Sequence, residues 1–182
     1  MFRSGRSFYR VAEPLIVFYQ VVMRPQWGQL ETGRAAAVWR DARQRFSAHV
    51  LGPHFEELCR QYAVAAPPSV FGVLPGEVGS GVVGDSAGRT SIQVDVVVLA
   101  PAAPSASRRV LSLGEAKYGE VMGIKHVERL RRARDLLSQR GYDTREVVLA
   151  CYSAAGFSRE LLSTDDPRLR LIGPDELYTM PQ

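Results

Sequence analysis

The sequence predicts an α/β protein: a three-layer α/β/α core around a mixed sheet, preceded by a small helical segment. Three apolar stretches carry this prediction. Residues 90–100 (TSIQVDVVVLA) and 109–117 (RVLSLGEAK) flank a Pro- and Ser-containing turn and so predict a β-hairpin. Residues 146–152 (EVVLACY) form a continuous apolar run, which is typical of a strand buried on both faces. A long helical pattern between the last two runs adds the crossover of an α/β core.

The first 49 residues predict helices packed on the core. Residues 13–23 (EPLIVFYQVVM) favour a short buried helix opened by Pro14, although their β-branched residues leave a strand open. Pro25 should end this element, and residues 26–34 read as a loop. Residues 35–50 predict a second helix. We therefore expect a helical segment over 1–49 and the main domain over 50–182.

The main domain should begin with a helix over 54–66, in which Phe55, Leu58, Cys59 and Tyr62 share one face. Residues 70–74 suggest a short strand, and the Gly- and Pro-rich residues 75–89 a loop or wide hairpin. After the hairpin, the expected elements are a helix within 119–140, the strand 146–152, a short helix, a strand over 169–172 and a terminal helix.

The composition of the chain limits the classes of function that it can have. The chain has 182 residues, a net charge of +4 and two distant cysteines, which we expect to be free thiols. The charge permits contact with a polyanion without requiring it. No apolar run is long enough to span a membrane, and no signal-peptide cleavage pattern is present, so a cytoplasmic location without membrane association is expected. Lysine occurs at Lys117 and Lys125 alone, against 21 arginines.

Asp95 lies in the middle of an apolar strand, where burial of a carboxylate is energetically unfavourable. Removing its hydration costs several kcal/mol unless donors or a cation replace the lost water. The alternative is an Asp95 that points outward to solvent beside Gln93. Glu115 and Lys117 lie two residues apart on the next strand, so their side chains share one face. A hairpin would bring them close to Asp95.

Two converging carboxylates repel each other and favour a hard divalent cation such as Mg²⁺. A neighbouring lysine can hold an attacking water and stabilise developing charge. Glu56, at the edge of the buried face of helix 54–66, is a further candidate ligand, either directly or through water. The plainer alternatives are a surface ion pair between Glu115 and Lys117 and an exposed Glu56.

The segments PHFEELCR, QVDVVV and LGEAK, in this order, resemble the PD-(D/E)XK nuclease superfamily. Together with YRVAEPLIVFY near the start, they resemble more fully the uncharacterised C-terminal domain of archaeal-type AAA ATPases, over roughly residues 8–152. The resemblance implies a restriction-endonuclease-like core, with Asp95, Glu115 and Glu56 as metal ligands and Lys117 as the catalytic lysine. It implies Mg²⁺, for which Mn²⁺ can substitute. Val94 stands where the motif has proline.

The expected activity is metal-dependent hydrolysis of phosphodiester bonds, with DNA as the favoured substrate. The chain contains no G-x-x-x-x-G-K-[ST] sequence, so the resemblance places the AAA-type ATPase partner in another domain or chain. Restriction-like cores often act in pairs, which leaves a homodimer open. The alternative function is a catalytically inactive nuclease-fold module that docks an ATPase and binds DNA or protein.

Two other patterns predict no site of their own. Residues 79–84 (GSGVVG) match G-x-G-x-x-G but precede a strand instead of a helix, so we expect a loop there and no dinucleotide site. The arginines between positions 129 and 134 can reach phosphates, but Glu128 and Asp135 lie four residues from Arg132 and Arg131. That spacing favours a solvated helix face with i,i+4 ion pairs.

Overall fold

The computed structural model describes residues 11, 13–102 and 107–179, and the described chain separates into two compact units. The helical unit extends to Phe55, and the sheet unit comprises the described residues from Glu56 onward. The division between the units falls inside helix α4 (Gly52–Ala65), six residues after the boundary expected at residue 49.

The helical unit is more helical than its sequence suggests. Its elements are α1 (Pro14–Phe18), the π-helical η1 (Tyr19–Met23), the 3₁₀-helical η2 (Arg24–Gln26), α2 (Trp27–Glu31), α3 (Ala35–Phe46) and η3 (Ser47–Leu51). The loop expected over 26–34 is wrong over 26–31, which are helical. Pro25 does not end the helix, because it sits in the first turn of η2, where its missing N–H is not needed. Gly52 likewise adopts helical angles and lets η3 continue into α4.

The prediction of a helix over 13–23 is confirmed, but its burial is not. Within the described stretch 13–26, burial is confined to Val22, whereas Leu15 and Ile16 are 69% and 48% exposed. The rings of Phe18, Trp39 and Phe46 pack edge to face, with centroids 5.2–6.5 Å apart. These aromatic contacts join α1 to α3 and leave one side of α1 without cover inside this unit.

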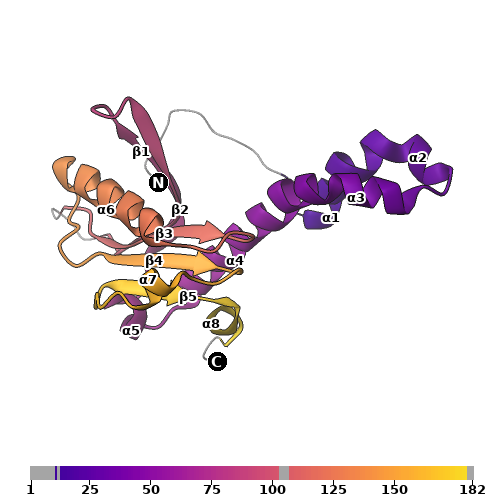
Figure 1. Cartoon of the computed structure of the whole chain (residues 1–182). Coiled ribbons are helices and arrows are strands. Elements are labelled where there is room, and N and C mark those ends of the chain that lie inside the picture. Colours follow the sequence, from indigo (N-terminus) through magenta and orange to yellow (C-terminus); the bar gives the residue numbers. More distant parts are fainter. Residues whose placement is uncertain (1–10, 12, 103–106, 180–182) are drawn as a thin grey trace. The chain divides into compact units, whose positions relative to one another are not determined.

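Five strands in the described residues form one mixed sheet in the order β1-β2-β3-β4-β5 (Figure 1). The strands are β1 (Glu77–Asp85), β2 (Thr90–Leu99), β3 (Val110–Lys117), β4 (Val148–Ser153) and β5 (Leu169–Ile172). β1, β2 and β3 pair antiparallel, whereas β3, β4 and β5 pair parallel. The predicted β2–β3 hairpin and the α/β class are confirmed.

The first strand lies outside the region expected for it. Residues 70–74 are not a strand: α5 (Pro68–Phe71) occupies their start, and β1 begins only at Glu77. The glycines of β1 hide its strand character, because glycine has low intrinsic strand preference and adds no alternating side chains. Pairing with β2 stabilises β1 as a strand, although the local sequence has no strand pattern. The GSGVVG segment thus lies in a strand, where no helix N-terminus faces it.

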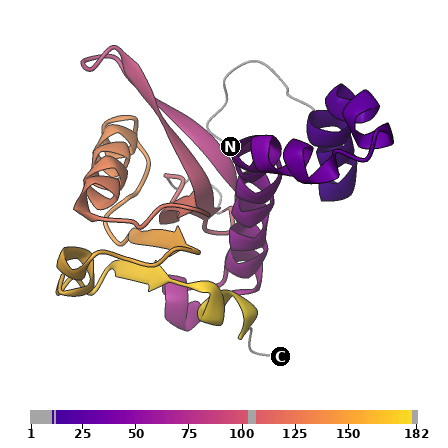
Figure 2. The ribbon, with the colours of Figure 1, turned by 45° about the vertical axis from the view of Figure 1, so that its right-hand side comes forward.

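Helices cover both faces of the sheet. α6 (Ile124–Gln139) packs Val127, Leu130 and Leu137 on one face, against a core that includes Val97, Leu113 and Leu149. On the other face, Tyr62 of α4 meets the buried ring of Tyr152 with centroids 6.3 Å apart. Figure 2 shows α6 and the second half of α4 on opposite sides of the sheet.

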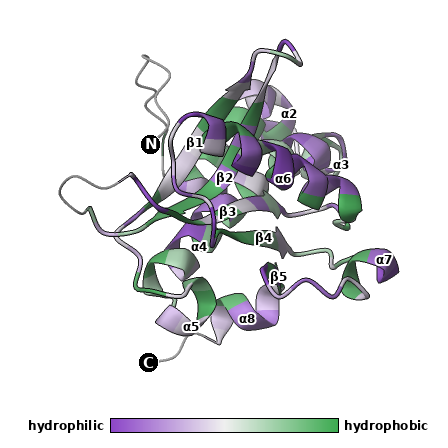
Figure 3. Ribbon diagram, turned by 90° about the vertical axis from the view of Figure 1, so that its left-hand side faces the viewer, coloured by the Kyte–Doolittle hydropathy of each residue, from purple (hydrophilic) through white to green (hydrophobic). Residues whose placement is uncertain are grey.

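The remaining helices, α7 (Arg159–Leu162) and α8 (Pro174–Tyr178), flank β5. Hydrophobic residues concentrate on the strands, so β4 is green along its length in Figure 3 while the outer side of α6 is purple. No helix in the described part of the chain combines the length and apolar character needed to cross a bilayer.

Candidate active site

The predicted acidic residues lie where β2 and β3 separate. The two strands pair from their hairpin as far as Val96 opposite Gly114. Beyond this point β2 continues outward with β1 as a two-stranded arm, whereas β3 continues beside β4 (Figure 1). We call the divergence, from Asp95 on β2 to Glu115 and Lys117 on β3, the β2–β3 fork. One further step of the register would place Asp95 opposite Glu115.

Asp95 sits on a bulge. Between the two pairs that β2 forms with Gly79 and Gly81 of β1, β2 has one residue more than β1. Such an insertion bends a strand and redirects a side chain. Asp95 is 5% exposed, and its Oδ1 accepts from Nε2 of Gln93 at 3.0 Å while Oδ2 accepts from the amide of Ala116 at 3.0 Å. The outward-facing alternative is therefore wrong.

Glu115 is 2% exposed, and its two oxygens have unequal surroundings. Two cationic side chains contact Oε1: Nζ of Lys117 lies 3.1 Å away and Nη1 of Arg129 lies 3.2 Å away. Oε2 is buried and has no hydrogen-bond partner among the described residues. A buried carboxylate oxygen without a donor is costly and is a position at which a ligand such as a metal ion would be stabilised.

Lys117 meets the prediction of a shared face with Glu115, because the two side chains are in direct contact. Its side chain is 31% exposed, so the ammonium group lies between the buried carboxylate and the surface. Glu120 lies in the same region. The pKa of the Glu120 carboxyl is lowered, chiefly by the hydrogen bond that Lys125 donates to it, with smaller contributions from His126 and Lys117.

Arg129 and Gln93 complete the fork and were not predicted as site residues. Besides its contact with Glu115, the Arg129 guanidinium donates to the main-chain oxygen of Gln93 at 3.5 Å. Gln93 in turn donates to Asp95, so a continuous chain of polar contacts joins Lys117 to Asp95. The partner of Arg129 lies on another element, so no spacing within α6 indicates this contact from the sequence.

The other arginines of α6 do not form the expected i,i+4 pairs. Arg132 binds both oxygens of Asp85 at 2.8 and 2.9 Å, and Arg131 lies 3.2 Å from Asp166. Arg134 pairs with Asp135, the residue beside it. The pairs of Arg132 and Arg131 connect α6 to the β1–β2 arm and to the segment before β5.

Glu56 joins the region through Arg60, not through the other two acids. Nη1 of Arg60 lies 3.8 Å from Oε2 of Glu56 and donates to the main-chain oxygen of Asp95 at 3.0 Å. No group of three or more His, Cys, Asp or Glu side chains within residues 11, 13–102 and 107–179 could hold a metal ion. Glu56, Asp95 and Glu115 therefore do not form a three-carboxylate cluster.

Both cysteines are free and buried, as expected. Burial raises the pKa of Cys151 to about 12, and the nearby Glu115 carboxylate adds to the shift. Burial also raises the pKa of Cys59, with Asp95 and Glu56 contributing in the same direction and Arg60 opposing them. The thiols stay protonated at neutral pH and are not placed to act as nucleophiles.

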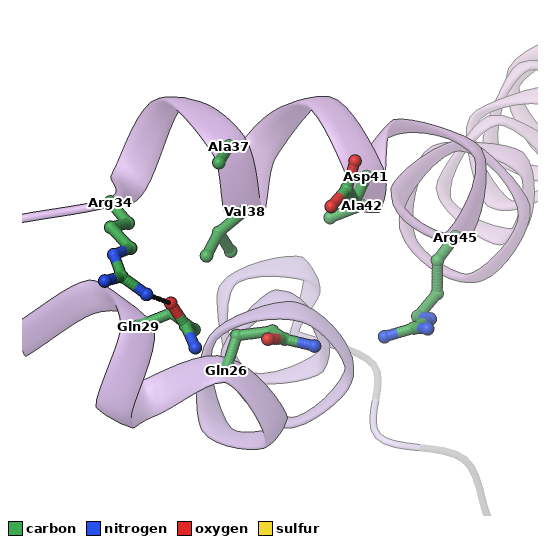
Figure 4. A pocket seen from close by; sticks show the side chains of 8 residues that line it. All are labelled: Gln26, Gln29, Arg34, Ala37, Val38, Asp41, Ala42 and Arg45. Carbon is green, nitrogen blue, oxygen red and sulfur yellow. Dashed lines mark hydrogen bonds between the residues drawn. The ribbon is translucent and has the colours of Figure 1, made fainter.

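The helical unit contains a polar cleft of about 260 Å³ between α2 and α3 (Figure 4). Its arginines are engaged: Arg34 donates to Oε1 of Gln29 at 2.9 Å, and Arg45 donates to the main-chain oxygen of Val21 at 3.5 Å. Asp41 offsets part of their charge. The cleft lacks the buried, unpartnered group that distinguishes the fork.

Comparison of the chain with protein-family models, curated proteins and solved structures found no match. Glu115 and Asp95 are both buried; Glu115 contacts an amine and a guanidinium and has one oxygen without a partner among the described residues, whereas Asp95 accepts from Gln93 and Ala116. Mg²⁺ is commonly held by one or two carboxylates with water completing its shell, so this donor set fits a hard divalent cation.

Proposed function

We propose that this chain is a metal-dependent phosphodiesterase acting on nucleic acid, with DNA as the favoured substrate and a restriction-endonuclease-like core. The observation that carries the proposal is Glu115. It is buried, it contacts Lys117, and one of its oxygens has no hydrogen-bond donor among the described residues. A surface ion pair would need neither the burial nor the second carboxylate.

The order of elements supports the same proposal. The acid on β2, the Glu-x-Lys on β3 and the glutamate on α4 stand on the second strand, the third strand and the preceding helix, as the resemblance implies. In this proposal Asp95 and Glu115 hold Mg²⁺ or Mn²⁺, and Glu56 contributes through water. Such a cation would acidify a bound water and neutralise charge on a phosphoryl oxygen. Lys117 would orient the water and stabilise developing negative charge.

Cleavage of DNA tests the activity. We expect the full chain to cleave plasmid or branched DNA with Mg²⁺ or Mn²⁺, and Asp95→Asn to lower the rate at least about 100-fold. Asp143→Asn is the matched control, because its carboxylate pairs with Arg145 outside the fork. Equal cleavage by wild type and Asp95→Asn would show that the fork is not the catalytic site.

A second candidate function is favoured by the surface of the helical unit. Large apolar side chains there are 41–69% exposed, namely Leu15, Ile16, Tyr19, Trp27 and Trp39. Such a surface is typical of contact with another protein. In this alternative the chain is a nuclease-fold module that docks an AAA-type ATPase, in cis or in trans, and binds DNA or protein without cutting. Mn²⁺ binding that depends on Asp95 would favour the enzyme, and its absence the module.

A further inference from the structure

Arg129 contacts Glu115 on β3 and the main chain of β2 at Gln93, two residues before Asp95. Its Nη1 lies 3.2 Å from Oε1 of Glu115, and its Nη2 lies 3.5 Å from the main-chain oxygen of Gln93, whose amide binds Asp95. Lys117 contacts the same Oε1. Two positive groups thus share one carboxylate oxygen, and the second oxygen has no partner among the described residues.

A divalent cation at this carboxylate would meet strong repulsion from both groups. Lys117 is fixed near Glu115 because the two residues lie on one face of the same strand. Arg129 reaches the site from α6, and its side chain is 42% exposed. A long, exposed side chain can swing into solvent at little energetic cost, so Arg129 is the group that can leave.

We propose that Arg129 is a place-holding cation: it competes with the metal ion for Glu115 and, once displaced, binds a phosphate group of the substrate. The inference rests on the proposed function. A guanidinium group matches a phosphate through two parallel hydrogen bonds, which a surface arginine beside the fork is well placed to form. Metal and nucleic acid would then strengthen each other's binding, because each favours the released form of Arg129.

The neighbouring arginines do not share this arrangement. Arg131, Arg132 and Arg134 pair with Asp166, Asp85 and Asp135, which lie outside the fork. Arg129 alone among these four pairs with a proposed metal ligand. Arg134 is a matched control, because its side chain is 37% exposed on the same helix and its loss removes the same charge.

The first test is calorimetric titration of Mn²⁺ into the full chain without nucleic acid. We expect Arg129→Gln to bind Mn²⁺ about five- to tenfold more tightly than wild type, the effect of removing one partly exposed competing charge. Arg134→Gln should bind as wild type does. Arg129→Lys, which keeps the charge, should also stay near the wild-type affinity. Equal affinities for wild type and Arg129→Gln, or a gain in Arg134→Gln as well, would overturn the proposal.

The second test measures coupling by fluorescence anisotropy of a short labelled duplex DNA, in EDTA and in Ca²⁺, a hard cation with oxygen ligands. Wild type should bind DNA several-fold more tightly with Ca²⁺ than in EDTA. Arg129→Gln should lose most of this gain, whereas Arg134→Gln should keep it. A gain of the same size in Arg129→Gln would contradict the proposed transfer to phosphate.

The two levels of the proposal fail differently. If wild type binds no Mn²⁺, or if Glu115→Gln binds it equally well, the metal site and the role of Arg129 are both wrong. If binding requires Glu115 but Arg129→Gln and wild type have the same affinity, the metal site stands and only the role of Arg129 is wrong.

Discussion

The main-chain amide of Ala116 donates a 3.0 Å hydrogen bond to the Asp95 carboxylate, where the next rung of a β-ladder would otherwise form. The last regular pair between β2 and β3 is Val96 opposite Gly114. A side chain of one strand therefore satisfies the backbone of the other at the point where they separate. The bond ties the Asp95 side chain to the residue that follows Glu115 on β3.

The two lysines of the chain offer a direct comparison. Lys117 contacts Glu115, whereas Lys125 pairs with Glu120 at 2.7 Å. We expect Lys117→Met to lower DNA cleavage about 10²–10³-fold while Mn²⁺ binding is retained, because the amine acts on water and charge instead of holding the metal. Lys125→Met should cleave within a few-fold of wild type. Loss of cleavage in Lys125→Met alone would reverse the assignment of the two lysines.

The arm formed by β1 and β2 should make stability depend on pH in the acidic range. Asp85 is buried, and the hydrogen bonds from Arg132 chiefly lower its pKa to about 2, helped by the amide of Gly88. A carboxyl whose folded pKa lies below its unfolded value of about 3.9 stabilises the fold above that value and loses its contribution as pH falls toward about 2.

Urea unfolding of wild type and Arg132→Gln across this range measures the effect. The variant should show a flatter dependence between about pH 4 and about pH 2, because its Asp85 pKa lies nearer the unfolded value. Asp143, whose pKa is also lowered to about 2 by Arg145, titrates in both proteins and does not account for a difference. Parallel curves for the two proteins would show that Arg132 does not hold Asp85.

Tyr152 is fully buried, and among the described residues its hydroxyl has no hydrogen-bond partner. Burial chiefly raises the pKa of this phenol well above its ordinary value, which keeps it neutral. Since an unpaired buried hydroxyl opposes folding, we expect Tyr152→Phe to leave the free energy of unfolding unchanged or raise it by up to about 1 kcal/mol in urea titration. A loss of more than that would mean that the hydroxyl is bonded in solution.

Gly114, directly before Glu115, is needed for packing against Tyr152. A Cβ atom at Gly114 would lie 2.7 Å from Cε2 of Tyr152 and 3.1 Å from Cβ of Val96. Gly114→Ala should therefore lower the free energy of unfolding by about 1–3 kcal/mol. Gly28→Ala is the control, because a Cβ atom there meets nothing within 4 Å and alanine favours the helix. Similar stability of the two variants would contradict the close contact at Gly114.

The sequence is most informative where local patterns and tertiary structure agree. The apolar runs of β2, β3 and β4 identify these strands, and the spacing of Glu115 and Lys117 predicts the contact between their side chains. β1 escapes detection because its glycines leave no pattern, so only its partner strand defines it. The sequence of α1 predicts a buried helix because it is rich in apolar residues, but several of these residues are exposed within the helical unit.

The site itself was predictable in part. An aspartate in an apolar strand indicates a special environment, but the bulge at Asp95 and the amide that binds it depend on how two strands separate. The partner of Arg129 lies on another element, and neither spacing nor composition identifies such a contact. Glu56 was expected beside the other acids, whereas its contact with Arg60 ties it to the backbone of β2 instead.

The central claim is that Asp95 and Glu115 together bind a divalent cation, and titration of Mn²⁺ followed by calorimetry tests it most directly. Wild type should bind Mn²⁺, Asp95→Asn and Glu115→Gln should lose that binding, and Glu146→Gln, which changes an exposed acid paired with Arg168, should keep it. Heats that are the same for wild type, Asp95→Asn and Glu115→Gln would contradict the claim.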